Sequence, residues 1–134
     1  MNVPQLAFDK LGGIVPAVVQ DAESGEVLMQ AFMNREAWET TLREGIVHYF
    51  SRSKGRIWKK GERSGNIQRV VEVWIDCDDD SVLLKVRQEG GAACHTGFRT
   101  CYHRRVDPDG VTSVGQPLFD PDRVYGPSGS SEEA

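Results

Sequence analysis

Hydrophobic and polar residues alternate along several short stretches of this chain, which is the pattern of strands with one buried face. Segments rich in Gly, Asp, Asn and Ser separate these stretches and favour turns. Alternation predicts strands at residues 68–75 and 82–88, and short runs bounded by turn signals predict further strands at 14–20, 26–32, 46–51 and 99–106.

One stretch, residues 35–44, follows instead the 3.6-residue period of an amphipathic helix. Asn34 is a suitable N-cap for it, and Gly45 is a suitable C-terminal cap. The predicted stripe on one face of the helix consists of Ala37, Trp38, Thr41 and Leu42. The fold class that we expect is therefore α+β, a strand-rich single domain with one main helix.

The length of 134 residues fits one domain, because a chain of this size buries roughly two-thirds of its unfolded surface. We expect an N-terminal lead-in at 1–13, the main domain at 14–106 and a C-terminal extension at 107–134. The last nine residues of the extension are rich in Gly, Ser and Glu, and we expect them to be disordered.

The first residues lack the basic and apolar regions of a signal peptide, and the most apolar run, 14–19, is too short for a membrane span. The three cysteines are an odd number, which argues against a disulfide framework and for a reducing compartment. We therefore expect a cytoplasmic protein with no membrane partner.

The net charge is −4, yet Lys and Arg gather between residues 52 and 63, where Glu62 is the one acidic residue. Domains that bind nucleic acid are usually basic overall. A basic loop in an acidic chain favours a small anionic ligand instead, and we expect no nucleic acid partner. The alternative is a charged loop that is simply solvated.

Residues 52–65 show neither a helical nor a strand period, and we expect a long functional loop there. Its cations, hydroxyls and backbone amides are groups that bind phosphate oxygens. Trp58 either stacks on a base or anchors the loop to the core. The candidate substrate-binding residues are Arg52, Ser53, Trp58, Lys60, Gly61, Glu62 and Ser64.

The cysteines Cys77, Cys94 and Cys101 are candidate zinc ligands. Three thiolates fill three tetrahedral positions and leave the fourth for water, which is the pattern of a catalytic zinc site. One alternative is a closed structural site with His103 or His48 as the fourth ligand. Another is three ordinary buried thiols.

His95 follows Cys94 directly, and adjacent side chains of an extended backbone point to opposite faces. It is therefore an unsuitable second ligand for the same ion. The intrinsic pKa of histidine suits a proton shuttle near neutral pH, and we assign His95 that catalytic role.

Three aspartates, Asp76, Asp78 and Asp80, recur at a period of two. In an extended segment their carboxylates share one face, where they repel one another unless a cation neutralises them. This predicts a hard divalent ion such as Mg²⁺. The segment is no calcium loop, because Ser81 and Arg87 stand where that loop requires Gly and Glu. A solvated acidic turn is the alternative.

Cys77 lies between these aspartates, and in an extended segment its side chain points away from them. We hypothesise that Cys77 is directed toward another subunit and that a zinc ion is shared across a two-fold interface. Together with the basic loop, the two metal sites predict a metal-dependent hydrolase of a small phosphorylated substrate.

Four segments resemble the phosphoribosyl-AMP cyclohydrolase family of histidine biosynthesis. They are His48-Tyr49-Phe50-Ser51-Arg52-Ser53, Trp58-x-Lys60-Gly61-Glu62-x-Ser64-Gly65-Asn66, Asp76-Cys77-Asp78-x-Asp80 and Ala93-Cys94-His95-Thr96-Gly97. The match runs in order over residues 14–106. The segment Thr100-Cys101-Tyr102-His103 departs from the family's usual Ser-Cys-Phe and an aromatic residue, but it keeps the thiolate.

The resemblance implies an intertwined homodimer in which Cys77 of one subunit binds Zn²⁺ together with Cys94 and Cys101 of the other. It also implies Mg²⁺ on Asp76, Asp78 and Asp80. The implied reaction is hydrolysis of the N1–C6 bond of the adenine ring of 1-(5-phosphoribosyl)-AMP by a zinc-activated water. The product is the formimino-aminoimidazole-carboxamide ribonucleotide.

Two competing functions belong to other classes. A zinc nucleotide deaminase requires His-x-Glu and Pro-Cys-x-x-Cys motifs, which the sequence lacks. A module with structural zinc that binds RNA or protein through the basic loop is the second, and it predicts unfolding when a metal ligand is lost.

Overall fold

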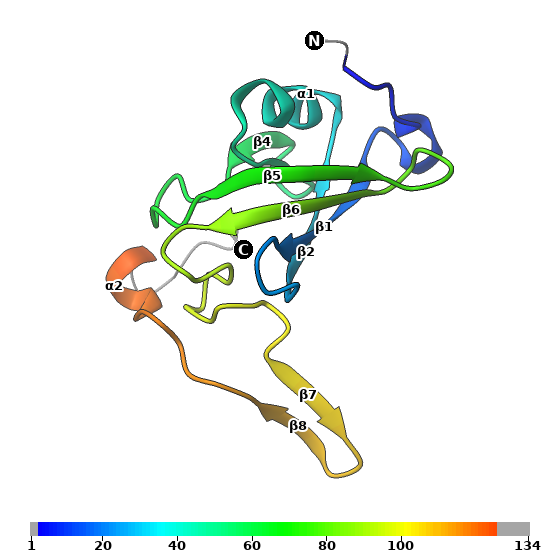
Figure 1. The fold of residues 1–134 in the computed structure, drawn as a ribbon. Helices are drawn as coiled ribbons and strands as arrows, with labels where there is room; N and C mark the ends of the chain where they lie inside the picture. Colours follow the sequence, from blue (N-terminus) through cyan, green and yellow to red (C-terminus); the bar gives the residue numbers. More distant parts are fainter. Residues whose placement is uncertain (1–2, 126–134) are drawn as a thin grey trace.

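A computed structural model describes residues 3–125 of the chain. Its main feature is a four-stranded sheet in the order β2-β1-β6-β5 (Figure 1). The strands are β1 (Val15–Asp21), β2 (Val27–Met33), β5 (Gln68–Ile75) and β6 (Val82–Gln88). The central β1–β6 pair is parallel, and the two outer pairs are antiparallel. All four strands were predicted from the sequence, and two of them, β5 and β6, from the alternation of hydrophobic and polar residues.

Alternate side chains of the central strands are buried, which is why the sheet forms one wall of the core. In β1, Val15, Ala17 and Val19 are fully inaccessible, and the residues between them are only partly covered. Leu84 and Val86 of β6 extend the same face. The hydrophobic effect on this shared face fixes the register, because a shift by one residue exposes every one of these side chains.

Helix α1 (Arg35–Glu44) has the bounds that the sequence predicts. The side-chain oxygen of Asn34 accepts a hydrogen bond from the Ala37 N–H at 2.9 Å, and Gly45 ends the helix in the left-handed conformation at φ 72°. Trp38 is the main apolar anchor of the helix, with 1% of its surface exposed, and its indole N–H donates to the Pro4 carbonyl.

The predicted loop at 52–65 is partly wrong, because strand β4 (Arg56–Lys59) lies within it. It pairs antiparallel with β3 (His48–Ser51) and forms a hairpin beside α1. The period was hidden because β4 has only four residues and three of them are Arg, Trp and Lys. Residues 60–65 do form turns, as expected for a loop.

The chain before β1 and after β6 adds short elements. A 3-10 helix, η1 (Phe8–Leu11), lies beside the β5–β6 connection, and a hairpin of β7 (Arg104–Asp107) and β8 (Gly110–Ser113) projects from the body (Figure 1). Helix α2 (Pro121–Tyr125) follows. The strand predicted at 99–106 is therefore correct only from Arg104. Residues 99–103 lie along the edge of β2 without forming a regular strand.

The architecture confirms the predicted class, a strand-rich α+β domain with one main helix. The predicted disorder at 126–134 falls outside the described residues. No helix within residues 3–125 combines the length and the apolar character that crossing a bilayer requires.

Candidate active site

The acidic segment forms the tight connection between β5 and β6. It is a turn and not an extended strand, and Asp79 adopts a positive φ of 63°. One carboxylate oxygen of Asp76 accepts hydrogen bonds from the backbone N–H groups of Asp80 and Ser81, at 3.0 and 3.1 Å. The extended conformation assumed from the period of two is therefore wrong.

The turn nevertheless brings Asp76, Asp78 and Asp80 together, with one carboxylate oxygen of each within 4.8 Å of the others. A hydrogen bond between Asp78 and Asp80 raises the pKa of Asp80 and lowers that of Asp78. The Lys10 ammonium lies 3.2 Å from Asp78 and 3.6 Å from Asp80. The Lys10 ammonium is thus a cation that already contacts oxygens of this cluster. Three carboxylates are hard oxygen donors, and such a set suits a divalent ion such as Mg²⁺.

A second cluster contains the thiols of Cys94 and Cys101, which lie close enough for each to shift the pKa of the other. The Cys94 sulfur also lies 2.9 Å from the Thr96 hydroxyl. Hydrogen bonds from Cys101 and Thr96 lower the pKa of Cys94 to about 4, whereas the bond to Cys94 and burial raise the pKa of Cys101. At neutral pH Cys94 is therefore a thiolate, the form that binds zinc.

Backbone hydrogen bonds fix this pair against the sheet. The Cys101 N–H donates to the Leu28 carbonyl of β2 at 2.7 Å, and the Gly97 N–H donates to the Cys94 carbonyl at 2.9 Å to close a turn. Gly97 has a φ of 94°, and a Cβ there would lie 2.4 Å from the Phe119 carbonyl oxygen. Only glycine fits this position, which explains the last residue of the Cys-His-Thr-Gly motif.

His95 lies close enough to the thiol pair that its charge helps to lower the pKa of Cys94. Its Nδ1 atom is buried and has no hydrogen-bond partner among the described residues. A buried imidazole nitrogen normally has a partner.

Cys77 is exposed and lies apart from the other two cysteines. It precedes β6, whereas Cys94 follows β6, and seven residues of strand span roughly 20 Å. Figure 1 places the two connections at opposite ends of the β5–β6 hairpin. Among the described residues, the aspartate cluster is the only group of three or more potential ligands within 4.8 Å of one another. One chain therefore does not assemble all three cysteines.

The two histidines considered for a closed zinc site are engaged elsewhere. The His48 Nδ1 atom lies 2.8 Å from the Ile46 carbonyl oxygen. His103 stacks on Phe98 with ring centroids 3.7 Å apart, and its Nδ1 atom lies 3.2 Å from the Ser113 hydroxyl. Neither joins Cys94 and Cys101 in a three-ligand group within the described chain.

The candidate substrate-binding residues divide into buried and exposed groups. Trp58 is 5% exposed and packs on Tyr49 with ring centroids 5.1 Å apart, which matches the anchoring alternative. Lys60 is 1% exposed, and its ammonium donates to the Ala93 carbonyl beside Cys94.

Arg52 is exposed, with its guanidinium 4.2 Å above the Phe32 ring. Of the remaining candidates, the exposed ones are Ser53 and Glu62, Ser64 is partly covered, and Gly61 is buried.

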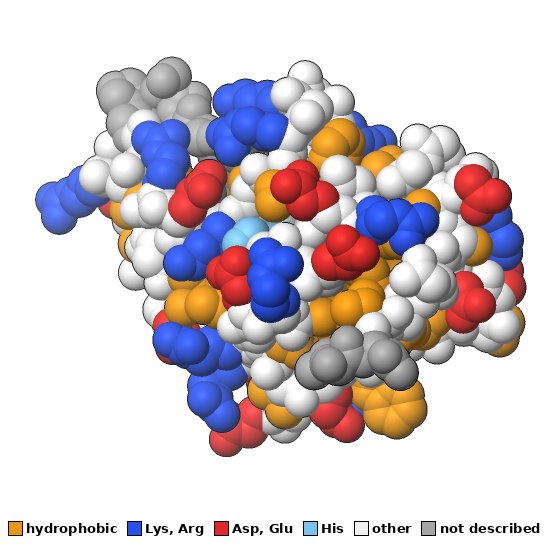
Figure 2. Space-filling view, turned by 90° about the horizontal axis from the view of Figure 1, so that it is seen from above, with side chains coloured by type: hydrophobic (Ala, Val, Ile, Leu, Met, Phe, Trp, Pro, Cys, Tyr) orange, Lys and Arg blue, Asp and Glu red, His pale blue; other side chains and the backbone are white. Residues whose placement is uncertain are grey.

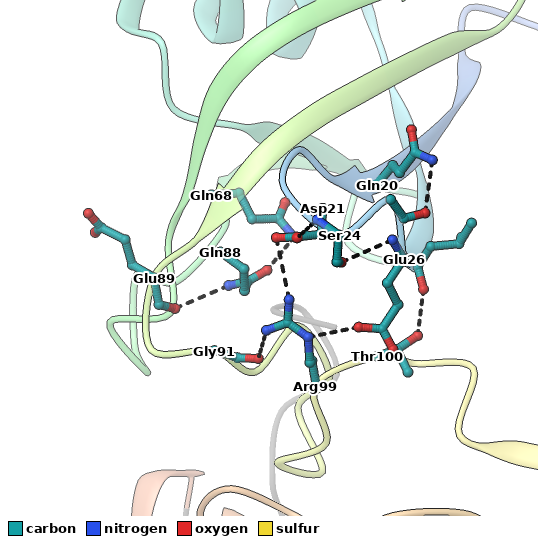
Figure 3. Close-up of polar contacts among 12 residues, drawn as sticks. Gln20, Asp21, Ser24, Glu26, Gln68, Gln88, Glu89, Gly91, Arg99 and Thr100 are labelled. Atoms are coloured by element: carbon teal, nitrogen blue, oxygen red, sulfur yellow. Dashed lines mark hydrogen bonds and ion pairs between the residues drawn. The ribbon is translucent and has the colours of Figure 1, made fainter.

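Ion pairs and a hydrogen bond connect residues 99–100, which precede Cys101, to the β1–β2 turn (Figure 3). The Arg99 guanidinium contacts Glu26 at 2.7 Å and Asp21 at 3.4 Å. The hydrogen bond that Asp21 accepts from the Ser24 N–H lowers the pKa of the Asp21 carboxyl, and the positive charge of Arg99 lowers it further. The Thr100 hydroxyl donates to the Val27 carbonyl at 2.8 Å. These contacts hold the residues immediately before Cys101.

Sequence patterns did not single out Lys10 or Arg99. Lys10 is 68 residues from Asp78, and Arg99 is 73 residues from Glu26. No local spacing signals contacts of this range. Thr96, by contrast, lies two residues from Cys94, and its place in the motif was a usable signal.

The charges on the face seen in Figure 2 are mixed, with Lys and Arg side chains interspersed among Asp and Glu. A nucleic-acid surface is usually a basic patch or stripe.

Comparison with known proteins places these motifs in a family. The family model described as phosphoribosyl-AMP cyclohydrolase matches residues 29–103, which include both clusters. A protein named phosphoribosyl-AMP cyclohydrolase from Desulfatibacillum aliphaticivorans is 59% identical over 121 residues, covering 90% of this chain and 97% of that protein. Those of the same name from Desulforapulum autotrophicum and Nitratidesulfovibrio vulgaris (strain DP4) are 55% and 56% identical. They cover 90% and 88% of this chain and 98% and 94% of their own lengths.

The match extends over most of the chain and over nearly the full length of these relatives. Both ligand clusters and His95 lie inside the matched residues. The chain therefore belongs to the phosphoribosyl-AMP cyclohydrolase family.

Proposed function

We propose that this protein opens the adenine ring of 1-(5-phosphoribosyl)-AMP by hydrolysis of the N1–C6 bond, as a step of histidine biosynthesis. The product is the formimino-aminoimidazole-carboxamide ribonucleotide. The observation that carries the proposal is the Cys94–Cys101 pair, with a thiolate at neutral pH and with His95 beside it. The names of the relatives agree with it.

The zinc ligands that we propose are Cys94 and Cys101 of one subunit and Cys77 of the other subunit of a homodimer. The pair supplies two soft donors at one point, while Cys77 is exposed at the far end of β6. Zinc held there supplies Lewis acidity, which brings the ionisation of water to a pKa of about 7. A second subunit is the simplest source of the third thiolate.

The chemistry of the substrate assigns a task to His95. The phosphoribosyl group on N1 withdraws electrons from the ring and makes C6 electrophilic. Water adds to C6, the C6–N1 bond breaks, and N1 requires a proton as it leaves. His95 is placed beside the thiol pair and moves this proton, which is a role suited to its intrinsic pKa. The exocyclic nitrogen stays on C6 as the carboxamide.

The phosphate groups require positive charge, and two parts of the chain supply it. Mg²⁺ on Asp76, Asp78 and Asp80 would bind phosphate oxygens while the carboxylates hold the ion. Arg52 and the turns after β4, with Ser53 and Ser64, add cations and hydroxyls. Lys60 and Trp58 are buried, and we assign them the role of holding these turns in place rather than of contacting phosphate.

The direct test is incubation of the purified protein with phosphoribosyl-AMP while ring opening is followed by ultraviolet absorbance. We expect turnover, its loss after a chelator removes zinc, and its recovery when zinc is returned. Turnover that survives exhaustive removal of metal contradicts the zinc proposal. Release of ammonia would instead identify a deaminase, because that reaction breaks the exocyclic C–N bond.

A further prediction concerns Arg99, which holds the residues before Cys101. We expect Arg99→Met to weaken zinc binding by roughly 10-fold or more, as the loss of a group that orients a ligand does. The matched control is Arg69→Met, because Arg69 also contacts a Glu at 2.6 Å but lies on β5 away from the thiols. The measurement is zinc competition against a chromophoric chelator, and equal affinities of the two variants contradict the assignment.

A further inference from the structure

The cation nearest to the aspartate cluster belongs to the protein itself. The Lys10 ammonium donates to a carboxylate oxygen of Asp78 at 3.2 Å and to the Asp78 carbonyl at 3.1 Å. It also lies 3.6 Å from an Asp80 oxygen. A single side chain thus partly neutralises two of the three carboxylates that the turn brings together.

The backbone that carries Lys10 is anchored to the core, whereas its side chain lies at the surface. Leu6 and Phe8 are 6% and 5% exposed and belong to the core, and the Ala7 N–H donates to the Asp79 carbonyl at 2.7 Å. The Lys10 side chain is 44% exposed. Rotation about its own bonds moves the ammonium into solvent without disturbing η1.

We propose that the Lys10 ammonium is an intramolecular counter-ion that occupies the aspartate cluster in the absence of a divalent cation and is displaced when the cation binds. The inference rests on the cation site of the proposed function. A divalent ion bound by several carboxylates outcompetes a monovalent ammonium, because exposed ion pairs of Lys and Asp are weak. Lys10 therefore sets the affinity of the site without being a ligand.

Removal of the competitor is expected to tighten cation binding. We expect Lys10→Met to lower the dissociation constant of Mn²⁺, used as the probe ion, by roughly two- to five-fold. Lys10→Arg keeps a cation within reach, and its dissociation constant should stay close to that of the unchanged protein. The measurement is titration of the full chain by electron paramagnetic resonance of free Mn²⁺.

The matched control is Lys85→Met. Lys85 pairs with Glu72 at 3.9 Å across the same β5–β6 hairpin, so the variant loses the same charge without touching the cluster. A dissociation constant of Lys10→Met that equals that of Lys85→Met overturns the inference, and so does weaker binding, which would mean that Lys10 organises the site.

Thermal unfolding supplies a second measurement that does not depend on turnover. With a chelator present, we expect Lys10→Met to unfold roughly 2–4 °C below Lys85→Met, because the carboxylates then repel one another without a counter-ion. With saturating Mg²⁺ the difference should vanish. A difference that is the same in both conditions overturns displacement.

The failure of this inference is distinguishable from failure of the cation site. Asp78→Asn with Asp80→Asn removes two of the carboxylates and should abolish Mn²⁺ binding. If the unchanged protein and this variant bind Mn²⁺ equally, the cation site itself is wrong and Lys10 has no cation to compete with. If they differ while Lys10→Met matches its control, the site stands and the role of Lys10 falls.

Discussion

Replacement of Cys94 by alanine is expected to lower the rate of phosphoribosyl-AMP ring opening by more than about 100-fold. Loss of groups that merely orient a metal ligand already costs 10- to 100-fold, and loss of the ligand itself costs more. Cys94 has a pKa of about 4, so this substitution removes the thiol that is ionised at neutral pH. Turnover and zinc content are to be measured on the same sample.

The fold should survive this change. The Cys94 turn closes through backbone hydrogen bonds, and Ala93, not Cys94, is the residue of this turn that belongs to the core cluster. Circular dichroism of Cys94→Ala should therefore match the unchanged protein. His95→Gln is the companion variant, since it should lose turnover by roughly 100-fold or more but keep its zinc. Unfolding of Cys94→Ala on loss of zinc would identify a structural site instead.

Mixing two inactive variants is expected to restore activity if the zinc site is shared between subunits. In a hybrid dimer of Cys77→Ser and Cys94→Ala, one site lacks both residues and the other site is intact. Random reassociation makes about half of the dimers hybrids, so about a quarter of the unchanged activity should return. The experiment requires mixing under mild denaturation, refolding with zinc, and an assay of ring opening.

The control for this experiment is a mixture of Cys94→Ala with Cys101→Ser. Both residues belong to the same half of the shared site, so each site of the hybrid lacks one thiolate, and no activity should return. Recovery in both mixtures, or in neither, contradicts a zinc ion held by Cys77 of one subunit and the thiol pair of the other.

Local patterns were sufficient for much of the fold. The bounds of α1 followed from Asn34 and Gly45, because capping depends on neighbouring residues only. A strand with a buried face, such as β6, was visible as alternation. Strand β8 was not, because all four of its residues are exposed and no buried face imposes a period.

The candidate site was predictable in its residues but not in its geometry. Asp76, Asp78 and Asp80 do converge, although through a turn with Asp79 in the left-handed region and not through a shared strand face. Cys77 lies before β6 and Cys94 lies after it, so the distance between them depends on the path of β6 through the fold. Sequence spacing alone could not give that direction, and it could not give long-range partners such as Arg99 and Lys10.

The parallel pairing of β1 with β6 has a consequence for how the protein is made. Val18 lies beside Leu83 in the register, so the two middle strands of the sheet come from distant parts of the chain. During synthesis on the ribosome, β1 and β2 can form a hairpin early, but the sheet cannot close until β6 has left the exit tunnel. Until then the edge of β1 that pairs with β6 keeps its backbone N–H and C=O groups unpaired, which is the condition in which a strand edge can pair with another chain.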